Sequence, residues 1–330
     1  MFNLLAVSSS LAIVIAVRVW KPEVRAPWYL FAFGQTLFVA GDVITYNYDT
    51  FFGVELPYPS VGDVLYIAVY PCLIAGLLVL TRRRSPGRDR DSVIDALVVA
   101  IAIGTIQWIF LMSPVAHDSA SSDLQKLVGM SYPLMDLFLF TAVVRLALGA
   151  GKRAPAMYLM AGAALALFLT DSAYTYIVVQ GVVYNQEGIL EAGWALFYFL
   201  WGAAALHPSM RTIADRAPEL PPRPSRARLL LLGGASLIAP TVMVLQQSQG
   251  QSVDVSVVLG AAVILFILVV IRMAGLVHRQ EQSTIRERAL RTAGSALVTA
   301  TDRDGIYEAA LEATRSLVGE DTAIRLLIAG

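Results

Sequence analysis

The sequence predicts an all-α polytopic membrane bundle of about nine transmembrane helices, built from helical hairpins. Of the 330 residues, 57% are hydrophobic and only 15% are charged, whereas roughly a quarter of a soluble domain is charged. Apolar stretches near the roughly 20 residues that cross a bilayer also recur between short connections rich in Pro, Gly and charge. The stretches fall at residues 2–17, 28–47, 61–80, 92–112, 124–148, 156–180, 188–206, 228–246 and 255–277.

The first apolar stretch is interpreted as a retained span. No basic segment precedes it, and the first basic residues, Arg18, Lys21 and Arg25, come after it. A secretory signal peptide has the opposite order, with positive charge before the apolar region.

The basic residues indicate how the spans are oriented. Fifteen Lys and Arg residues gather in four alternate connections: Arg18, Lys21, Arg25; Arg82, Arg83, Arg84, Arg88, Arg90; Lys152, Arg153; and Arg211, Arg216, Arg223, Arg226, Arg228. The other connections are acidic, and Lys126 is the only base near them. Because basic connections stay in the cytoplasm, we expect a multi-pass protein of the bacterial cell membrane with its N-terminus outside and its C-terminus in the cytoplasm.

Several chemical classes have no signal in the sequence. Cys72 is the only cysteine, so an intrachain disulfide is excluded. The three histidines lack metal-ligand spacing, and no hydrolase, phosphate-loop or zinc-protease motif occurs. No catalytic residue, metal or cofactor is therefore assigned, and the basic connections suit anionic lipid rather than nucleic acid.

A second pattern is an internal repeat with a constant spacing. The triplet that begins at Arg25 recurs at Arg153, and we call the spacing between these two arginines the repeat offset. The residues that it relates are mainly polar, aromatic or Pro. The matched pairs are Gly34 and Gly162, Asp63 and Glu191, Tyr66 and Trp194, Tyr70 and Tyr198, and, with a slip of one position, Asp42 and Asp171. We interpret residues 25–150 and 153–277 as parallel repeats, with chance similarity between apolar segments as the alternative.

Acidic and aromatic residues inside the spans form the candidate ligand-binding set. Carboxylates avoid lipid, so they should face the bundle interior, water or a partner. Acids and aromatic rings together suit a cation, an amphipathic amine or a proton. The alternative is structural, as helix caps and interhelical hydrogen bonds, above all for Asp63, which follows a Pro-Ser turn. The set is Asp42, Asp63, Tyr66, Tyr70, Asp136, Asp171, Glu191, Trp194 and Tyr198.

The C-terminal part of the sequence changes character. Residues 278–298 are polar and helix-favouring, and predict a cytoplasmic linker helix that continues the last span. Residues 299–330 resemble the start of a GAF domain: a Thr301-Asp302 step, a helix from Tyr307 to Val318, Gly319 and a strand at 323–329. The resemblance implies an incomplete α/β fragment, and we expect the chain to be a piece of a longer protein.

Most of residues 25–277 is similar to the multi-span membrane input regions of actinobacterial GGDEF/EAL signalling proteins. The similarity rests on the turn from Pro59 to Asp63, on Tyr70-Pro71 and on the GAF-like tail. It implies that residues 1–277 form a sensory module that regulates cyclic di-GMP synthesis or hydrolysis by output domains absent from this chain. A homodimer through the linker helix is expected, and the alternative function is a secondary transporter or permease.

Overall fold

The computed structural model describes residues 2–84, 90–149, 153–182, 188–215, 226–248, 254–299, 305–307 and 311. Within these ranges every regular element is a helix and no strand occurs, which confirms the all-α bundle. The elements are α1 (Phe2–Trp20), α2 (Ala26–Tyr46), α3 (Tyr48–Phe52), α4 (Val61–Arg84), α5 (Arg90–Gln107), a π-helix (Trp108–Met112), α6 (Ser113–His117), α7 (Asp123–Leu148), α8 (Pro155–Val179), α9 (Ile189–Leu206), a 3-10 helix (Pro208–Thr212), α10 (Arg226–Ser248) and α11 (Val255–Thr299).

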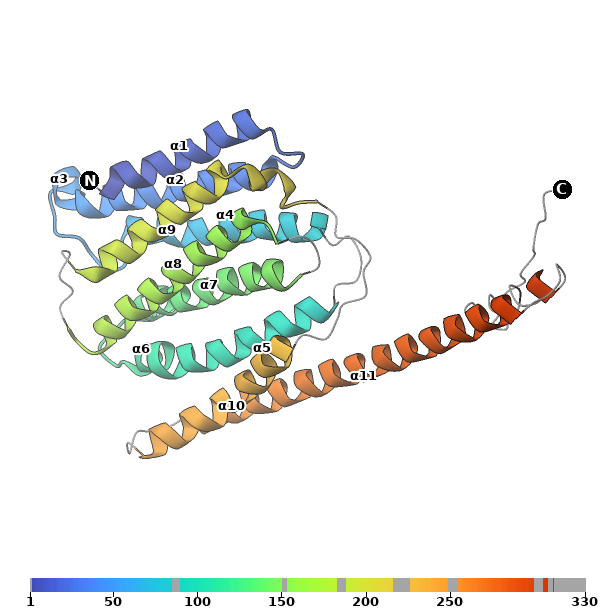
Figure 1. Ribbon diagram of the computed structural model, residues 1–330. Coiled ribbons are helices and arrows are strands. Elements are labelled where there is room, and N and C mark those ends of the chain that lie inside the picture. The colour runs from blue at the N-terminus through green and yellow to red at the C-terminus, as the bar shows by residue number, and fades with distance from the viewer. Residues whose placement is uncertain are drawn as a thin grey trace. The chain divides into compact units, whose positions relative to one another are not determined.

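The chain divides into two compact units, Met1–Val269 and Val270–Gly330. In the first unit, α1, α2, α4, α7, α8 and α9 pack in a closed ring, in which each helix contacts the next and α9 contacts α1. Helix α5 packs on the outside of this ring against α7, and α10 packs on α5 (Figure 1). Antiparallel neighbours such as α2 with α4 and α8 with α9 form the predicted hairpins.

Seven of the described helices are long and apolar enough to cross a membrane. They are Asn3–Trp20, Val61–Arg84, Arg90–His117, Asp123–Leu148, Pro155–Val179, Ile189–Leu206 and Val255–His278. The predicted count of nine is therefore not supported. Helix α2 forms where a span was expected, but Gln35, Asp42 and its tyrosines lower its hydropathy. In α10 the described apolar part is the shorter segment Gly233–Val244.

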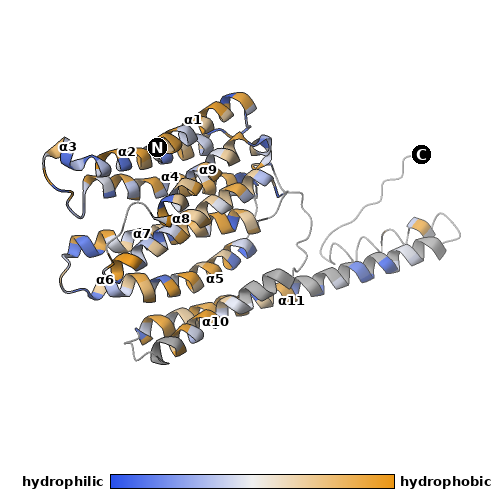
Figure 2. Ribbon diagram, turned by 60° about the vertical axis from the view of Figure 1, so that its left-hand side comes forward, coloured by the Kyte–Doolittle hydropathy of each residue, from blue (hydrophilic) through white to orange (hydrophobic). Residues whose placement is uncertain are grey.

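Apolar residues dominate the helix bodies, whereas hydrophilic residues concentrate toward the connections (Figure 2). Large apolar side chains such as Leu4, Val64 and Phe199 remain exposed on the helix surfaces. A soluble protein rarely exposes apolar surface on this scale, so the arrangement is consistent with a membrane protein.

Proline occurs inside three of these helices, at Pro71 in α4, Pro133 in α7 and Pro240 in α10. Proline interrupts the backbone ladder, and neighbouring helices make this tolerable in membrane proteins. The π-helical turn at Trp108–Met112 comes just before Pro114. Since Pro114 has no N–H to donate, a local widening of the helix at this position has a simple cause.

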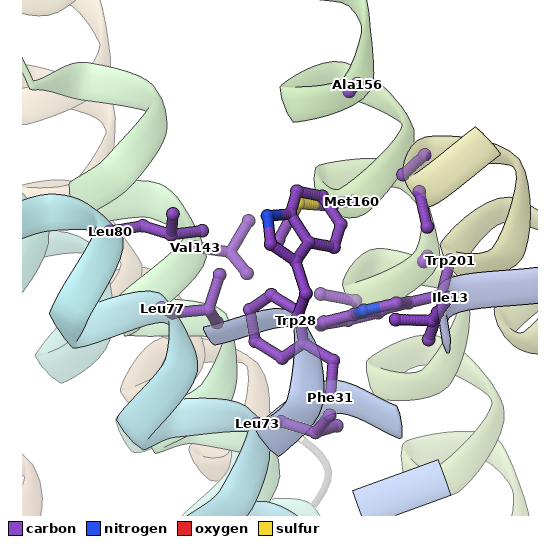
Figure 3. Packing of buried hydrophobic residues seen from close by; sticks show 14 of the residues in the cluster. Ile13, Trp28, Phe31, Leu73, Leu77, Leu80, Val143, Ala156, Met160 and Trp201 are labelled. Atoms are coloured by element: carbon purple, nitrogen blue, oxygen red, sulfur yellow. The ribbon is translucent and has the colours of Figure 1, made fainter. Parts of the chain in front are cut away.

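Aromatic residues of α2 and α9 form the centre of the apolar core. Trp28, Phe31 and Trp201 are fully buried, and the ring of Phe31 makes edge contacts with both indoles. Figure 3 shows these rings meeting side chains from the neighbouring helices, among them Ile13 of α1 and Met160 of α8. This cluster holds both predicted repeats and the first helix together.

The helix ends that flank the basic connections lie at one end of the bundle, which we call the basic end. The Trp20 indole N–H, at the end of α1, donates to the Leu206 carbonyl oxygen at the end of α9 (3.0 Å). The Arg84 guanidinium, at the end of α4, lies 3.3 Å from Met157 Sδ at the start of α8. Predicted spans one, three, six and seven therefore have their basic termini together, as the alternation of charge requires.

Helix α11 runs without a break from Val255 to Thr299 and includes the predicted linker at 278–298. It spans the boundary between the two units. Of the GAF-like segment, 305–307 and 311 are helical. The strand predicted at 323–329 lies outside the described residues, so the α/β character of this segment is not supported.

Candidate functional site

Asp42, near the end of α2, is the first of two buried carboxylate centres. Its side chain is 3% exposed. The Tyr66 hydroxyl of α4 donates to Asp42 Oδ1 (2.9 Å), and the Tyr198 hydroxyl of α9 lies 3.5 Å from Asp42 Oδ2. Phe38 packs edge-on against both tyrosine rings. Two hydroxyl donors for two carboxylate oxygens leave this acid fully paired.

Asp171 of α8 forms the second centre. The Trp194 indole N–H of α9 donates to Asp171 Oδ1 (2.6 Å), and the Tyr70 hydroxyl oxygen of α4 lies 2.9 Å from Asp171 Oδ2. The same Tyr70 oxygen lies 2.8 Å from Asp136 Oδ1 of α7. A tyrosine with an exposed fraction of only 2% thus joins two carboxyl groups from different helices.

The two centres share one pattern of contacts: each aspartate has one partner from its own hairpin and one from the other hairpin, and we call this arrangement crossed. Tyr66 and Trp194 each bond the aspartate of their own hairpin, on the preceding long helix. Tyr70 and Tyr198, one turn further along α4 and α9, each reach the aspartate of the opposite hairpin. The repeat offset relates Tyr66 to Trp194 and Tyr70 to Tyr198, so equivalent positions make equivalent bonds.

Close helix contacts also recur at the repeat offset. A Cβ added to Gly34 would meet Cys72 at 3.2 Å, and one added to Gly162 would meet Leu200 at 3.4 Å. The offset that relates the two glycines also relates Cys72 to Leu200. Helices α2 and α4 therefore pack in the same register as α8 and α9, as two copies of one hairpin would.

Asp63 has the structural role that its sequence context suggested. Its Oδ2 accepts from the Ser60 backbone N–H (2.7 Å) and hydroxyl (3.0 Å), while Ser60 Oγ accepts from the Gly62 N–H (3.1 Å). These bonds cap the first turn of α4. In addition, the Tyr132 hydroxyl of α7 donates to Asp63 Oδ1 (2.6 Å), so the cap also ties two helices together.

Glu191 lies at the start of α9, as predicted, and is partly exposed. The Tyr46 hydroxyl at the end of α2 lies 3.5 Å from its Oε1. Asp63 and Glu191 are thus at the end of the bundle opposite to the basic end, which we call the acidic end. Of the nine predicted site residues, seven form the two crossed centres and these two lie beyond them.

Three polar residues of the bundle interior and its acidic end were missed by sequence reasoning. Tyr132 and Tyr46 are the interhelical partners of Asp63 and Glu191. Gln35 of α2 is fully buried, and neither its amide nitrogen nor its oxygen has a hydrogen-bond partner among the described residues. The signals were a Tyr-Pro pair at Tyr132 and an uncharged amide within an apolar stretch.

A further polar contact joins α11 to the π-helical turn. Asp254, just before α11, accepts from the Ser113 hydroxyl (2.6 Å) and the Trp108 indole N–H (2.9 Å) through one oxygen. These two bonds, the Ser113 bond foremost, hold the pKa of Asp254 below its ordinary value because they favour the charged carboxylate. The contact fixes the first turn of α11 next to the end of the α5 span.

Metal chemistry finds no support in this arrangement. Within the described ranges no group of three or more His, Cys, Asp or Glu side chains is arranged to hold a metal ion. The donors around the buried carboxylates are tyrosine hydroxyls and an indole N–H, which stabilise negative charge or take part in proton exchange.

Comparison of the chain with protein-family models, with curated proteins and with solved structures found no match. Function is therefore inferred from the geometry of the bundle and from the sequence.

Proposed function

We propose that this chain is the membrane-embedded sensory input region of a signal-transduction protein. The observation that supports the proposal is the continuity of α11, which extends from the candidate span Val255–His278 to Thr299 as one helix. A helix that leaves the membrane without a break passes a displacement of the span directly to whatever follows it. A transporter has no need for such an extension.

The buried carboxylates supply the second requirement of a receptor, which is two states with different affinity for an input. Asp42, Asp136 and Asp171 are joined to five helices through shared tyrosines and an indole. A change of charge at any of them alters hydrogen bonds between helices. Such a network is costly to build in a membrane, and ionisable residues kept there are generally functional.

We further propose that all nine long helices cross the bacterial cell membrane, α2 and α10 included. The basic end faces the cytoplasm and the acidic end faces outward, in line with the positive-inside rule. The N-terminus then lies outside and the polar half of α11 in the cytoplasm. Helix α2 tolerates its polar residues because Gln35 and Asp42 point into the protein, where both are buried.

For the output we keep the hypothesis that the resemblance implies. A GAF-like domain begins at 299–330, and GGDEF or EAL domains beyond this chain make or break down cyclic di-GMP. Residues 278–298 are proposed to pair with those of a second copy, since parallel linker helices are a common way to join receptor subunits.

A distance measurement in lipid nanodiscs tests the receptor proposal. In a Cys72→Ser background, which removes the only native cysteine, spin labels are attached to Thr50→Cys and Glu287→Cys, both at exposed positions. The label-to-label distance is recorded in neutral and mildly acidic buffer and with a quaternary amine. We expect one of these inputs to shift the distance, and Asp171→Asn to abolish the shift.

The second candidate function is a secondary transporter, favoured by the contacts of Tyr70 and Tyr198, each of which reaches from one hairpin to the aspartate of the other. Repeats that meet at a buried polar site are a common transporter architecture. Two results together would favour the transporter and contradict the receptor. The first is uptake of a cation or amine into proteoliposomes that is lost in Asp171→Asn, and the second is an unchanged distance between the labels at Thr50 and Glu287.

A further inference from the structure

The Tyr70 hydroxyl group lies within hydrogen-bond distance of two carboxyl groups, although it has only one hydrogen to donate. Its oxygen lies 2.8 Å from Asp136 Oδ1 and 2.9 Å from Asp171 Oδ2, and both distances are those of full O–H···O hydrogen bonds. A tyrosine hydroxyl carries one hydrogen, and an ionised carboxylate is only an acceptor. Two bonds between three oxygens require two hydrogens, so one carboxyl group must supply the second.

The remaining contacts decide which carboxyl group supplies it. Asp171 also accepts the Trp194 indole N–H through its other oxygen (2.6 Å). As a carboxylate, Asp171 therefore has a donor for each oxygen, the indole and the Tyr70 hydroxyl. Asp42 has a hydroxyl beside each oxygen, Tyr66 at 2.9 Å and Tyr198 at 3.5 Å, and shares neither of them with a second carboxyl group.

Asp136 is different. It is 1% exposed, its Oδ1 contacts only Tyr70, and its Oδ2 is buried with no hydrogen-bond partner in the part of the chain that the structure describes. A buried, singly bonded carboxylate is the least stable form of this group, whereas a carboxylic acid needs one acceptor, which the Tyr70 oxygen provides.

We propose that Asp136 is a proton-binding site, and that Tyr70 couples the bound proton to the Asp171 carboxylate. In the loaded state, Asp136 donates its O–H to the Tyr70 oxygen and Tyr70 donates to Asp171. Proton loss converts the acid to a carboxylate and changes the charge of the pair from −1 to −2. Tyr70 can then donate to only one of the two carboxylates, and Asp136 on α7 and Asp171 on α8 repel each other.

The described surroundings offer no positive charge to relieve that repulsion. None of the described contacts of Tyr70, Asp136 or Asp171 involves Lys, Arg or His. The basic residues of the adjoining helices lie toward helix ends: Arg82, Arg83 and Arg84 in the last turn of α4, Lys126 near the start and Arg145 in the last turn of α7, and Arg90 at the start of α5. The titratable groups nearer the site are Cys72 and a set of acids and phenols: Asp42 and Tyr46 on α2, Asp63 and Tyr66 on α4, Tyr132 on α7, Tyr174 on α8, and Glu191 and Tyr198 on α9. The ligand that fits this site is therefore the proton itself.

This inference deepens the proposed receptor function by naming its input, although the proton site does not depend on that function. Infrared spectroscopy of the full chain in lipid vesicles tests it, because a protonated carboxyl group has a C=O stretching band distinct from carboxylate and amide bands. We expect this band in neutral buffer, a shift of the band in D₂O, and its loss in Asp136→Asn. Asp118→Asn, in an exposed loop, is the control and should leave the band unchanged.

Tyr70→Phe gives a second and independent readout. Without the phenol oxygen, the Asp136 acid loses its acceptor, so the band should move to the higher frequency of an unbonded carboxylic acid. The proposal is overturned if the wild-type chain has no such band, if Asp136→Asn retains it, or if Tyr70→Phe leaves its frequency unchanged. A band that behaves as expected, with a distance between the labels at Thr50 and Glu287 that stays the same between neutral buffer and alkaline buffer in which the band is lost, would keep the proton site and reject the proton as the input of the receptor.

Discussion

At the scale of single residues, the bundle depends on a few tight contacts of small side chains with rings. A Cβ on Gly76 of α4 would overlap the ring of Phe31, which is itself wedged between Trp28 and Trp201. All three side chains are fully buried, so the Phe31 ring cannot move aside into solvent. Glycine is needed at position 76 for packing rather than for backbone conformation.

Gly76→Ala should therefore lower the free energy of unfolding by about 1–3 kcal/mol, the usual cost of overpacking. Gly260→Ala in α11 is the matched control, since a Cβ there meets no atom within 4 Å. Thermal unfolding in detergent compares the two variants with the wild-type chain. Equal unfolding temperatures for both variants would show that Phe31 moves aside without cost.

The hydrogen bond from Tyr132 to Asp63 gives a second prediction for a single side chain. Tyr132→Phe removes the donor at 2.6 Å and leaves a capping carboxylate with one partner fewer, which should cost about 1 kcal/mol. Tyr158→Phe is the control, because Tyr158 is 54% exposed. Chemical denaturation in mixed micelles measures both, and a Tyr158→Phe effect as large as that of Tyr132→Phe would contradict the assignment.

At the scale of the elements, a single carboxylate joins the start of α11 to the end of the α5 segment. The start of α11 depends on Asp254, which receives two hydrogen bonds from the π-helical turn and the first residue of α6. The bonds are made to the ionised carboxylate, so this junction depends on pH.

The junction at Asp254 should loosen only in strongly acidic buffer. Its folded-state pKa lies below the ordinary value of 3.8, so its stabilising contribution is complete above pH 3.8 and is lost as the pH falls through the lower folded-state pKa. Hydrogen exchange of the first turn of α11 measures the loosening. Asp254→Asn should exchange faster already at neutral pH, and an identical profile for both chains would reject the role of the carboxylate.

Helix α11 also gives a prediction about transmission. Proline inside a helix removes a backbone hydrogen bond and costs about 3 kcal/mol or more, so Glu281→Pro should interrupt the helix outside the apolar segment. We expect the distance between labels at Thr50 and Glu287 to lose its response to the input, while Glu281→Ala retains it. A response that survives Glu281→Pro would rule out α11 as the rigid conduit.

At the scale of the whole molecule, charge is sorted between the two ends of the bundle. Contacts such as that of Arg84 with Met157, and of Arg211 with the Trp20 ring (6.0 Å), gather basic residues at one end. The capped Asp63 and Glu191 lie at the other end. The bundle thus has a basic end and an acidic end, and under the positive-inside rule the proposed topology has the basic end in the cytoplasm.

The orientation has a direct test. In the Cys72→Ser background, a membrane-impermeant thiol reagent applied to intact cells should label Thr50→Cys at the acidic end and leave Arg153→Cys unlabelled. Inverted membrane vesicles should reverse the result, because the basic end then faces the reagent. Labelling of Arg153→Cys in intact cells would place the basic end outside and contradict the proposed topology.

The sequence alone determined the all-α class of the fold and pointed to the seven residues of the two carboxylate centres, but not to Tyr46, Tyr132 or Gln35. Long continuous apolar stretches predict a helical membrane bundle, because a helix satisfies its own backbone in lipid and barrel strands would alternate apolar with polar residues. A carboxylate within an apolar stretch stands out because lipid cannot solvate it. The repeat offset even paired Tyr66 with Trp194 and Tyr70 with Tyr198 before their contacts were known.

Only the tertiary structure decided what those residues do to one another. Helical periodicity places Tyr66 and Tyr70 on one face of α4, but it does not say that Tyr66 bonds its own hairpin and Tyr70 the opposite one. Which partner each side chain meets depends on how non-adjacent helices pack, and packing is a property of the whole bundle. The proton proposed for Asp136 depends on the same packing, since donors and acceptors can be counted only once the oxygens of Tyr70, Asp136 and Asp171 have been brought together.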